Sequence, residues 1–327
     1  IWIREMFNNK YGGSSMIEVT HVSKNFGSFR AVNDVSFSIP TGQIVGLLGP
    51  NGAGKTTTMR MITVFLSPTD GKILIDGTDI SQTPVEAKRK IGYMPESAPL
   101  YSDMIVEDYL RYIAEMHGED ADVKIPALCA ECGLKEVMHK NISDLSRGNR
   151  QRVALAHSLM HDPEILILDE PTSGLDPNQV EEVRSIIREI GKTRTVIIST
   201  HILSEVEMLC SRVIIISGGK LVADGPTEEL RAKFGNEMSV KLILGGVKEN
   251  ESFEDLKSVK NVAEVKILES DVREAQTVFV SVSGDEEIRP EIFRKIVEKG
   301  WSLYEMSLQK NSLEDVFHVL TSVKEDA

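Results

Sequence analysis

The chain has 327 residues, and its 37 basic and 50 acidic side chains give it a formal net charge of −13. Hydrophobic residues make up 41% of it, an ordinary globular proportion, and the length suffices for two domains that each have a core. The acidic balance argues against a protein that mainly grips a nucleic-acid backbone, because that task needs basic surface. No run of about 18 apolar residues occurs, so the sequence predicts no membrane span. Its three cysteines indicate a reducing compartment rather than a disulfide framework.

Short apolar strands and helices alternate over the first two thirds of the chain. Residues 1–15 carry no signal-peptide pattern, and we expect them to be a flexible leader ahead of Met16 or a remnant added for expression. The expected elements are strands at 17–22, 31–39 and 43–48, a helix at 55–65, a strand at 72–76, a mainly helical stretch from about 102 to 160, strands at 164–168, 195–199 and 212–216, and helices at 178–190 and 202–209. Such alternation predicts a parallel sheet with helices on its faces.

The pattern changes after about residue 234. Strands are expected at 238–244, 262–268, 276–282 and 301–307, with helices at 251–256, 287–298 and 313–320. The first six of these elements follow the order β-α-β-β-α-β, which is that of a ferredoxin-like α+β domain. We therefore expect one domain over 16–234 and a small C-terminal accessory domain over 235–327.

A phosphate-binding motif follows the third expected strand. The run Gly49-Pro50-Asn51-Gly52-Ala53-Gly54-Lys55-Thr56 fits G-x-x-x-x-G-K-[ST], with an apolar strand before it and a helix after it. Glycines let the backbone fold tightly, so that successive N–H groups point at phosphate oxygens, and the helix presents its positive end to the anion. We expect Lys55 to reach the β- and γ-phosphates, Thr56 to ligate Mg²⁺, and Thr57 to contact the α-phosphate.

Two carboxylates end a later strand. Asp169 and Glu170 follow the apolar run at 165–168, which places them at the ligand-binding edge of an open α/β sheet. We expect Asp169 to hold Mg²⁺, and Glu170 to orient and deprotonate an attacking water.

Together with further motifs over about 16–234, these residues resemble the nucleotide-binding subunits of ABC transporters. By this resemblance Phe26 stacks on adenine, Glu96 stands at the Q-loop position, and Ser173–Asp176 form the D-loop. Residues 145–149, Leu-Ser-Arg-Gly-Asn, stand at the signature position, and His201 is the switch histidine. Phe26 could instead be a strand residue packed inward, His201 a solvated loop residue, and Asp176 also a helix cap.

The resemblance implies a P-loop NTPase core with an antiparallel β subdomain and a helical subdomain at about 98–162. It implies an ATPase that uses ATP and Mg²⁺. The implied catalytic residues are Glu170, His201 and Lys55. Nucleotide contacts would come from Phe26, residues 49–57, Ser146, Gly148 and Asp176. Metal ligands would be Thr56, Asp169 and Glu96.

The resemblance also implies partners. Two copies, or this chain and a similar ATPase, would bind ATP head to tail between Lys55 of one subunit and Ser146 of the other. Hydrolysis would then separate them. A separate polytopic permease would dock in a groove lined by 96–110 and hold the chain at the cytoplasmic face of the cell membrane. No nucleic-acid partner is expected.

Two positions depart from the family pattern. Arg147 replaces a glycine of the signature, and Glu96 replaces the glutamine of the Q-loop. Both variants resemble a subgroup that pairs with ABC-2-type membrane subunits, many of them exporters. That subgroup also often carries a small C-terminal domain with a motif like Ser312–Phe317.

Two other functions are alternatives to a transporter subunit. A soluble ABC-type ATPase acting on ribosomes or DNA is the main alternative, and an unrelated P-loop kinase or GTPase is a third. Cys129 and Cys132, near His117 and His139, could form a metal site, but we expect the two cysteines to be packed in the core. A basic strip of Arg150, Arg152, His157 and His161 could be a nucleic-acid groove, but we expect it to be a solvated helix face.

Overall fold

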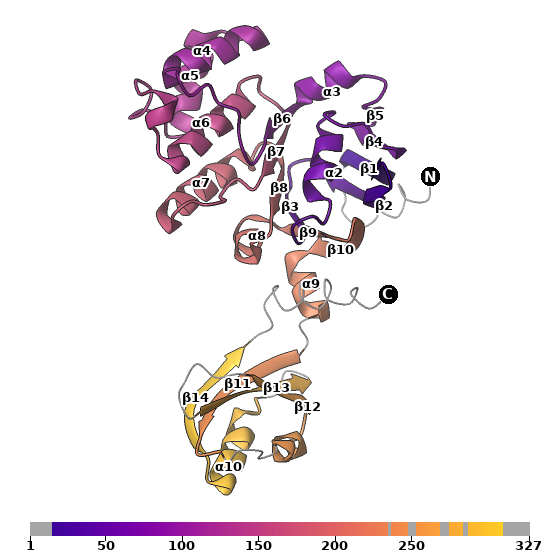
Figure 1. The fold of residues 1–327 in the computed structure, drawn as a ribbon, viewed down its shortest axis with the longest axis vertical. Helices are drawn as coiled ribbons and strands as arrows, with labels where there is room; N and C mark the ends of the chain where they lie inside the picture. Colours follow the sequence, from indigo (N-terminus) through magenta and orange to yellow (C-terminus); the bar gives the residue numbers. More distant parts are fainter. Residues whose placement is uncertain (1–14, 235–236, 248–252, 269–274, 284–286, 310–327) are drawn as a thin grey trace. The chain divides into compact units, whose positions relative to one another are not determined.

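The structure is a computed structural model that describes residues 15–234, 237–247, 253–268, 275–283 and 287–309. The chain divides into two compact units, the first ending at Pro226 and the second beginning at Thr227 (Figure 1). The units are described separately below. None of the helices in these described ranges has both the length and the apolar character of a membrane span.

An antiparallel sheet opens the first unit. Its strand order is β2-β1-β4-β5, and its elements are β1 (Ser15–Phe26), β2 (Phe29–Pro40), β4 (Asp70–Ile75) and β5 (Thr78–Asp79). β1 and β2 form a hairpin that ends with Phe26 paired to Phe29, and Gly27 supplies the positive φ of 59° in its turn. The hairpin therefore holds two aromatic side chains at one end of this sheet.

A six-stranded sheet forms the centre of the first unit, in the order β10-β9-β3-β8-β7-β6. β10 is antiparallel to β9, and the other neighbours are parallel. Its strands are β3 (Ile44–Leu48), β6 (Ile91–Met94), β7 (Ile165–Asp169), β8 (Thr195–Thr200), β9 (Arg212–Ser217) and β10 (Lys220–Pro226). Every residue of β7, β8 and β9 is buried, as continuous β-branched runs predict for a sheet covered on both faces.

Helix α2 (Lys55–Ile62) joins the two sheets of this unit into one core. Met59, Met61 and Ile62 are fully buried in a cluster that also takes side chains from β1, β2, β7 and β9. The helix ends at Ile62, earlier than the expected Phe65, because Val64 adopts a left-handed backbone with φ of 59°. Val64 packs partly buried against the same cluster.

The remaining helices of the first unit fall into two groups. α4 (Val106–His117), α5 (Ala121–Glu131), the 3₁₀ turn η1 (Ile142–Asp144) and α6 (Arg147–Leu159) form the expected helical segment (Figure 1). α7 (Pro177–Ile190) and α8 (Leu203–Leu209) connect strands of the central sheet, and α3 (Pro84–Lys90) leads from β5 of the antiparallel sheet to β6. This arrangement confirms the predicted α/β architecture, whereas α3, β5, β6 and β10 were not predicted.

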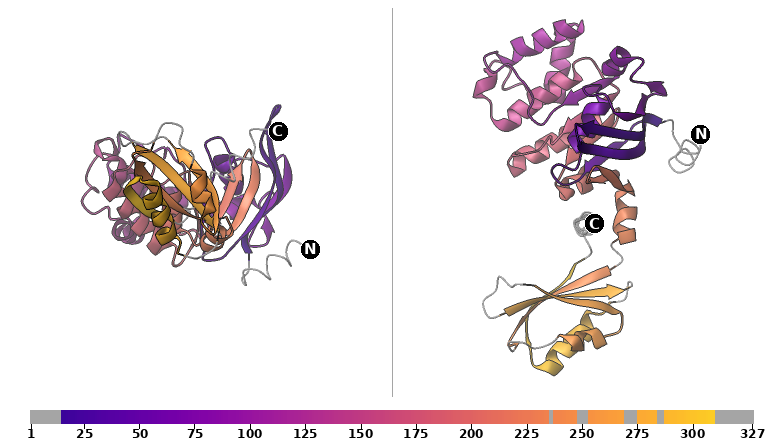
Figure 2. Two further views of the ribbon diagram at one scale, coloured as in Figure 1. Left: turned by 90° about the horizontal axis from the view of Figure 1, so that it is seen from below. Right: turned by 45° about the vertical axis from the view of Figure 1, so that its right-hand side comes forward.

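The second unit contains a four-stranded sheet in the order β12-β13-β11-β14, with all neighbours antiparallel. Its elements are α9 (Thr227–Phe234), β11 (Glu237–Gly245), the 3₁₀ turn η2 (Glu254–Ser258), β12 (Val262–Leu268), β13 (Ala275–Ser283), α10 (Arg289–Lys299) and β14 (Ser302–Gln309). α10 lies on one face of the sheet (Figure 2), where Ile292, Ile296 and Trp301 are buried with Val240 and Val280. A 3₁₀ turn replaces the first expected helix. The expected helix at 313–320, the motif at Ser312–Phe317 and residues 1–14 of the expected leader lie outside the described residues.

Candidate active site

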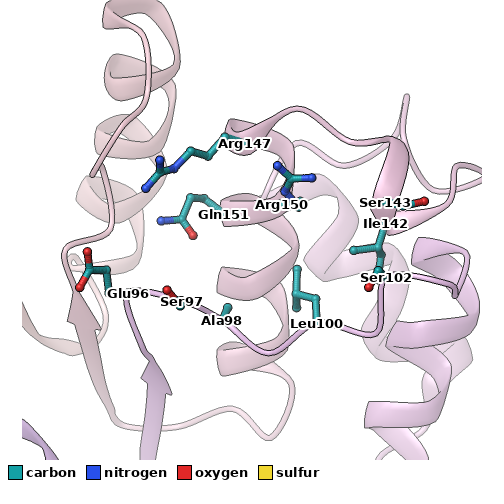
Figure 3. A pocket seen from close by; sticks show the side chains of 10 residues that line it. All are labelled: Glu96, Ser97, Ala98, Leu100, Ser102, Ile142, Ser143, Arg147, Arg150 and Gln151. Atoms are coloured by element: carbon teal, nitrogen blue, oxygen red, sulfur yellow. The ribbon is translucent and has the colours of Figure 1, made fainter.

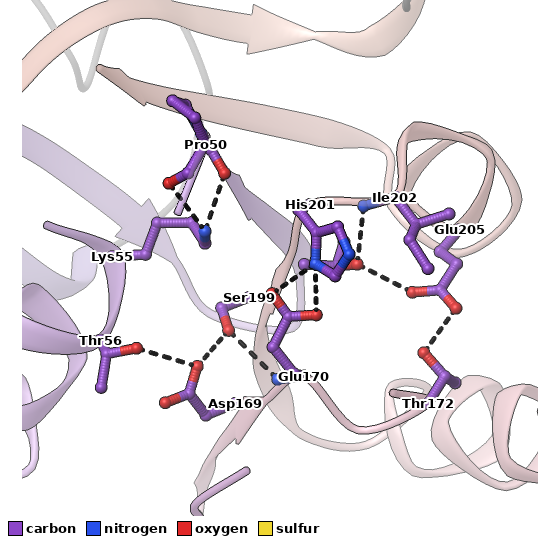
Figure 4. A network of polar contacts seen from close by, with 12 residues as sticks. Pro50, Lys55, Thr56, Asp169, Glu170, Thr172, Ser199, His201, Ile202 and Glu205 are labelled. Atoms are coloured by element: carbon purple, nitrogen blue, oxygen red, sulfur yellow. Dashed lines mark hydrogen bonds and ion pairs between the residues drawn. The ribbon is translucent and has the colours of Figure 1, made fainter. Parts of the chain in front are cut away.

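The loop between β3 and α2 is a tight, glycine-dependent turn. Gly52 and Gly54 have φ values of 78° and 104°, and a Cβ atom on Gly54 would overlap the carbonyl oxygen of Ala31. Both positions therefore require glycine. The Lys55 ammonium is folded back onto the loop, where Nζ donates to the carbonyl oxygens of Gly49 at 2.7 Å and Pro50 at 3.3 Å (Figure 4).

Lys55 is a buried cation beside three acidic groups. Burial lowers its pKa, while the negative charges of Glu170, Asp169 and Glu96 raise it, and the lowering is the larger effect. An anion that enters the loop would pair with this ammonium and favour its charged form. The local electrostatics therefore suit a phosphate-bearing ligand.

Asp169 and Thr56 face each other from β7 and α2. The Thr56 hydroxyl donates to Asp169 Oδ1 at 3.4 Å, and the Ser199 hydroxyl at the end of β8 donates to the same oxygen (Figure 4). Asp169 is 3% exposed. Its contacts keep one carboxylate oxygen fixed beside the phosphate loop.

Glu170 turns sharply out of the end of β7. Its φ is 49°, a left-handed backbone that is held by hydrogen bonds from its N–H to the carbonyl oxygen of Ser199 at 3.1 Å and to the Ser199 hydroxyl at 3.2 Å. This turn directs the carboxylate toward His201, whose Nδ1 lies 3.0 Å from each carboxylate oxygen. Burial raises the pKa of Glu170, and the contacts with His201 and Lys55 oppose that rise. A carboxylate with a raised pKa is better suited to accept a proton near neutral pH.

A cavity of about 270 Å³ opens over these residues. Its lining includes Phe26, Phe29, Ala31, Asn51, Gly52, Ala53, Gly54, Lys55, Thr56, Thr57, Glu96 and Glu170. Phe26 is 48% exposed and Phe29 64% exposed, so both rings of the β1–β2 hairpin are available to a ligand. Phe29 was not singled out from the sequence, although its spacing across a two-residue turn from Phe26 would have indicated it.

The signature residues lie elsewhere in the chain. Ser146 caps the N-terminus of α6 and accepts a hydrogen bond from the N–H of Asn149 at 3.3 Å. A Cβ on Gly148 would overlap the side chain of Gln179 on α7, so this glycine permits close packing of the two helices. Neither Ser146 nor Gly148 lines the 270 Å³ cavity.

Asp176 is the N-cap of α7 and accepts from the backbone N–H groups of Asn178 and Gln179, both at 3.0 Å. It therefore caps the helix as expected. Like Ser146 and Gly148, it stands outside the lining of the 270 Å³ cavity. Its contact with a nucleotide stays a prediction.

A second cavity, of about 400 Å³, lies between the segment after β6 and helix α6 (Figure 3). Its lining residues are Glu96, Ser97, Ala98, Leu100, Ser102, Ile142, Ser143, Arg147, Arg150 and Gln151. Gln151 also donates to the carbonyl oxygen of Pro171, at 3.2 Å, next to Glu170. Because Pro171 follows Glu170 in the chain, this hydrogen bond links the second cavity to the segment that carries the Glu170 carboxylate.

Two other sequence features have structural roles. Cys132 is completely buried, and burial raises the pKa of its thiol, as expected for core packing. No group of three potential metal ligands was found among the histidine, cysteine and acidic residues of the described ranges. The prediction of a solvated basic face is wrong for two histidines, because Nδ1 of His157 is hydrogen-bonded to the Tyr109 hydroxyl at 2.6 Å and Nε2 of His161 to the carbonyl oxygen of Ile91 at 3.1 Å.

Comparison with known families identifies the chain. A family model described as "ABC transporter" matches residues 32–173, and one described as "ATP-binding protein DrrA1-3-like, C-terminal domain" matches residues 225–320. A model of an AAA domain, described as a putative AbiEii toxin, matches 141–207. The YhaQ protein of Bacillus subtilis, an uncharacterised ABC transporter ATP-binding protein, is 33% identical over 92% of this chain and 97% of its own length. The chain belongs to the ABC transporter ATP-binding proteins.

Two further relatives and one solved structure extend this result. The linearmycin resistance ATP-binding protein LnrL of Bacillus subtilis is 30% identical over 94% of this chain and 98% of its own length. The probable multidrug ABC transporter ATP-binding protein YbhF of Escherichia coli is 39% identical over 69% of this chain, and the match spans 39% of that relative's length. An ATP-binding subunit of an ABC transporter of known structure is 30% identical, with a TM-score of 0.61 over 68% of this chain and 94% of that one. The predicted family is thus confirmed, and the ABC cassette fold with it.

Proposed function

We propose that this ABC protein is an ATPase that powers a membrane transporter, of the ABC-2 export type. One observation carries the proposal: Glu170, whose carboxylate contacts His201 at 3.0 Å, lines the same cavity as Lys55 and Thr56. A base, a cation and a phosphate loop meet there, which is the set that hydrolysis of a phosphoanhydride needs. The family models and the relatives support the same reaction.

Each residue of the site has a role that its position supports. The loop over 49–54 and the N-terminus of α2 bind the phosphates, and Lys55 supplies a positive charge to the terminal ones. Glu170 orients a water molecule and accepts its proton, while His201 holds the Glu170 carboxylate in place and presents its other nitrogen to the γ-phosphate. Phe26 stacks on the adenine ring.

Magnesium fits the donor set of this site. Thr56 and Asp169 offer a hydroxyl and a carboxylate 3.4 Å apart, and Glu96 adds a carboxylate on the lining of the same cavity. Mg²⁺ prefers such oxygen ligands. Bound there, it would neutralise negative charge on the phosphates.

Dimerisation completes the site in this proposal. Ser146, Gly148 and Asp176 stand away from the chain's own nucleotide cavity, so they are free to contact a nucleotide held by a second copy or by a similar ATPase. The N-terminus of α6 then faces the γ-phosphate across the interface. ATP joins the two subunits, and its hydrolysis separates them.

The 400 Å³ cavity beside Glu96 is the docking place that we propose for a polytopic permease. It lies at the predicted 96–110 segment, and through Gln151 and Pro171 it reaches the Glu170 segment. Relatives named for linearmycin resistance, multidrug transport and bacitracin transport favour export as the direction. In this proposal the chain is peripheral at the cytoplasmic face of the membrane.

We also propose that the C-terminal domain is ferredoxin-like. The strand order β12-β13-β11-β14 with antiparallel neighbours is that of two interleaved β-α-β units, with η2 in the place of one helix. The structure divides the chain into compact units between Pro226 and Thr227. The predicted domain boundary between residues 234 and 235 stays our prediction.

Trapping the dimer tests the function. Glu170→Gln should bind ATP with magnesium and lose turnover, so that it migrates as a dimer in size-exclusion chromatography with ATP and as a monomer without it. Glu115→Gln, an exposed change of the same kind on α4, should behave as the parent protein does. Full turnover by Glu170→Gln would remove Glu170 from the role of base, and a monomer at saturating ATP would contradict the dimer mechanism.

A further inference from the structure

A buried carboxylate outside the nucleotide cavity connects the two catalytic segments. Glu205 on α8 is 4% exposed, and each of its two carboxylate oxygens accepts a hydrogen bond (Figure 4). Oε1 accepts from the Thr172 hydroxyl at 2.5 Å, and Oε2 accepts from the Thr200 hydroxyl at 2.9 Å. Arg184 of α7 approaches Oε1 at 3.9 Å and supplies positive charge. A buried acid with this set of partners is well compensated for its loss of water.

Thr200 places one of these bonds beside the switch histidine. It is the last residue of β8 and is fully buried. Its hydroxyl donates to Glu205 and also accepts the backbone N–H of Ile202 at 3.0 Å. The two hydrogen bonds thus hold Thr200 and Ile202, the residues on either side of His201, and so fix the backbone conformation at His201.

Thr172 places the other bond beside the catalytic carboxylate. It is buried two residues after Glu170, in a turn closed by a hydrogen bond from the N–H of Ser173 to the carbonyl oxygen of Glu170 at 3.1 Å. The carbonyl oxygen of Thr172 in turn accepts from the N–H of Leu175 at 3.2 Å. The segment after Glu170 is therefore anchored through the Thr172 side chain.

We propose that Glu205 is a positioning residue for ATP hydrolysis, whose carboxylate ties the segment carrying Glu170 to the segment carrying His201 and so sets the contact between these two side chains. This proposal rests on the roles proposed above for Glu170 and His201. Glu205 does not line the nucleotide cavity, so it acts through Thr172 and Thr200. A residue needed only to fill space here would be apolar, because a buried carboxylate is costly unless its hydrogen bonds are used.

The relation of kcat to KM in the full-length protein tests this inference. Glu205→Ala should lower the kcat for magnesium ATP by about tenfold while KM changes by less than about twofold, because the phosphate loop is intact and only the catalytic pair is misplaced. Glu205→Gln should lie between Glu205→Ala and the parent, because its amide retains one acceptor and can still join both hydroxyls. Glu207→Gln, an exposed change on the same helix, should leave kcat unchanged.

A double-mutant cycle separates positioning from general destabilisation. Thr172→Val removes the hydroxyl at constant shape and should lower kcat on its own, but it should have little further effect in the Glu205→Ala background. Fully additive effects, an unchanged kcat in Glu205→Ala, or a kcat and KM that worsen together without improvement in Glu205→Gln would overturn the proposal. If Glu205→Ala does not fold, the cycle of Glu205→Gln with Thr172→Val gives the same test.

Glu170→Gln in the same assay keeps this proposal apart from the proposed function. Loss of turnover in Glu170→Gln with full turnover in the Glu205 variants would overturn the positioning role alone. Full turnover in Glu170→Gln would overturn the assignment of Glu170 as the base.

Discussion

The Nδ1 atom of His201 lies 3.0 Å from both carboxylate oxygens of Glu170. An ionised carboxylate can only accept hydrogen bonds, so Nδ1 carries the proton in this contact. The Nε2 atom is then left for another partner, and the His201 side chain is 48% exposed. The contact orients the carboxylate, and in the proposed mechanism it leaves a nitrogen for a phosphate oxygen.

Loss of His201 should shift the pH dependence of hydrolysis. Glu170 must be ionised to act as a base. Burial raises its pKa, and the contact with His201 makes that rise smaller. His201→Ala therefore raises the Glu170 pKa further, so the acid limb of the kcat profile should move to higher pH and kcat at neutral pH should fall. The measurement is kcat at saturating ATP against pH, with the exposed His139→Ala as the control. An acid limb that stays in place would show that His201 does not influence the base.

The arginine of the signature motif is packed on the D-loop of the same chain. Gly174 has φ of 68°, and a Cβ there would overlap the guanidinium of Arg147. The overlapping atoms are the far end of an exposed, flexible side chain that can move aside, so Gly174→Ala should destabilise the fold by only the roughly 1–3 kcal/mol that a left-handed alanine costs. Gly77→Ala is the matched control, because Gly77 has φ of 74° and open space around it. Urea unfolding of both variants checks this expectation.

Arg147→Gly removes the guanidinium that the new methyl group would displace. The cost of Gly174→Ala should therefore be about the same in the parent and in the Arg147→Gly background, and close to that of Gly77→Ala. A clearly larger cost in the parent that falls in the Arg147→Gly background would show that the guanidinium cannot move aside.

The sequence predicted those parts of the site that depend on local pattern. The phosphate loop, the strand-end acids and the parallel strands were predictable because their residue types follow from backbone geometry and burial. The partners of Glu205 were not predictable, because Thr172, Thr200 and Glu205 meet only through the pairing of β7 with β8 and the return of α8. The same limit explains the error at His157, whose partner Tyr109 is 48 positions away.

The partly buried His157 of α6 should make the protein sensitive to acid. Burial, with smaller contributions from His117 and His161, lowers the pKa of His157 from 6.5 to about 4. As pH falls below 6.5, His157 binds a proton in the unfolded chain, but in the folded protein it does so only near pH 4. The free energy of unfolding therefore decreases as pH falls across this interval.

Removal of the imidazole should weaken that dependence. In His157→Gln, the melting temperature should fall less steeply between about pH 7 and pH 5 than in the parent protein. Thermal unfolding at a series of pH values measures both slopes, and the exposed His139→Gln should keep the parent's slope. Parallel slopes for the parent and His157→Gln would contradict a His157 that stays neutral in the folded protein.

The two rings of the β1–β2 hairpin should contribute unequally to ATP binding. Phe26 and Phe29 both line the nucleotide cavity, but Phe29 is the more exposed, at 64% against 48%. Lys24 Nζ lies 5.4 Å from the centre of the Phe26 ring and helps to hold that ring in place. Phe26→Ala should therefore raise KM for ATP by about tenfold, as loss of about 1–3 kcal/mol of base stacking predicts, while kcat changes little. Phe29→Ala should raise KM less, and a larger effect there would assign the stacking role to Phe29 instead.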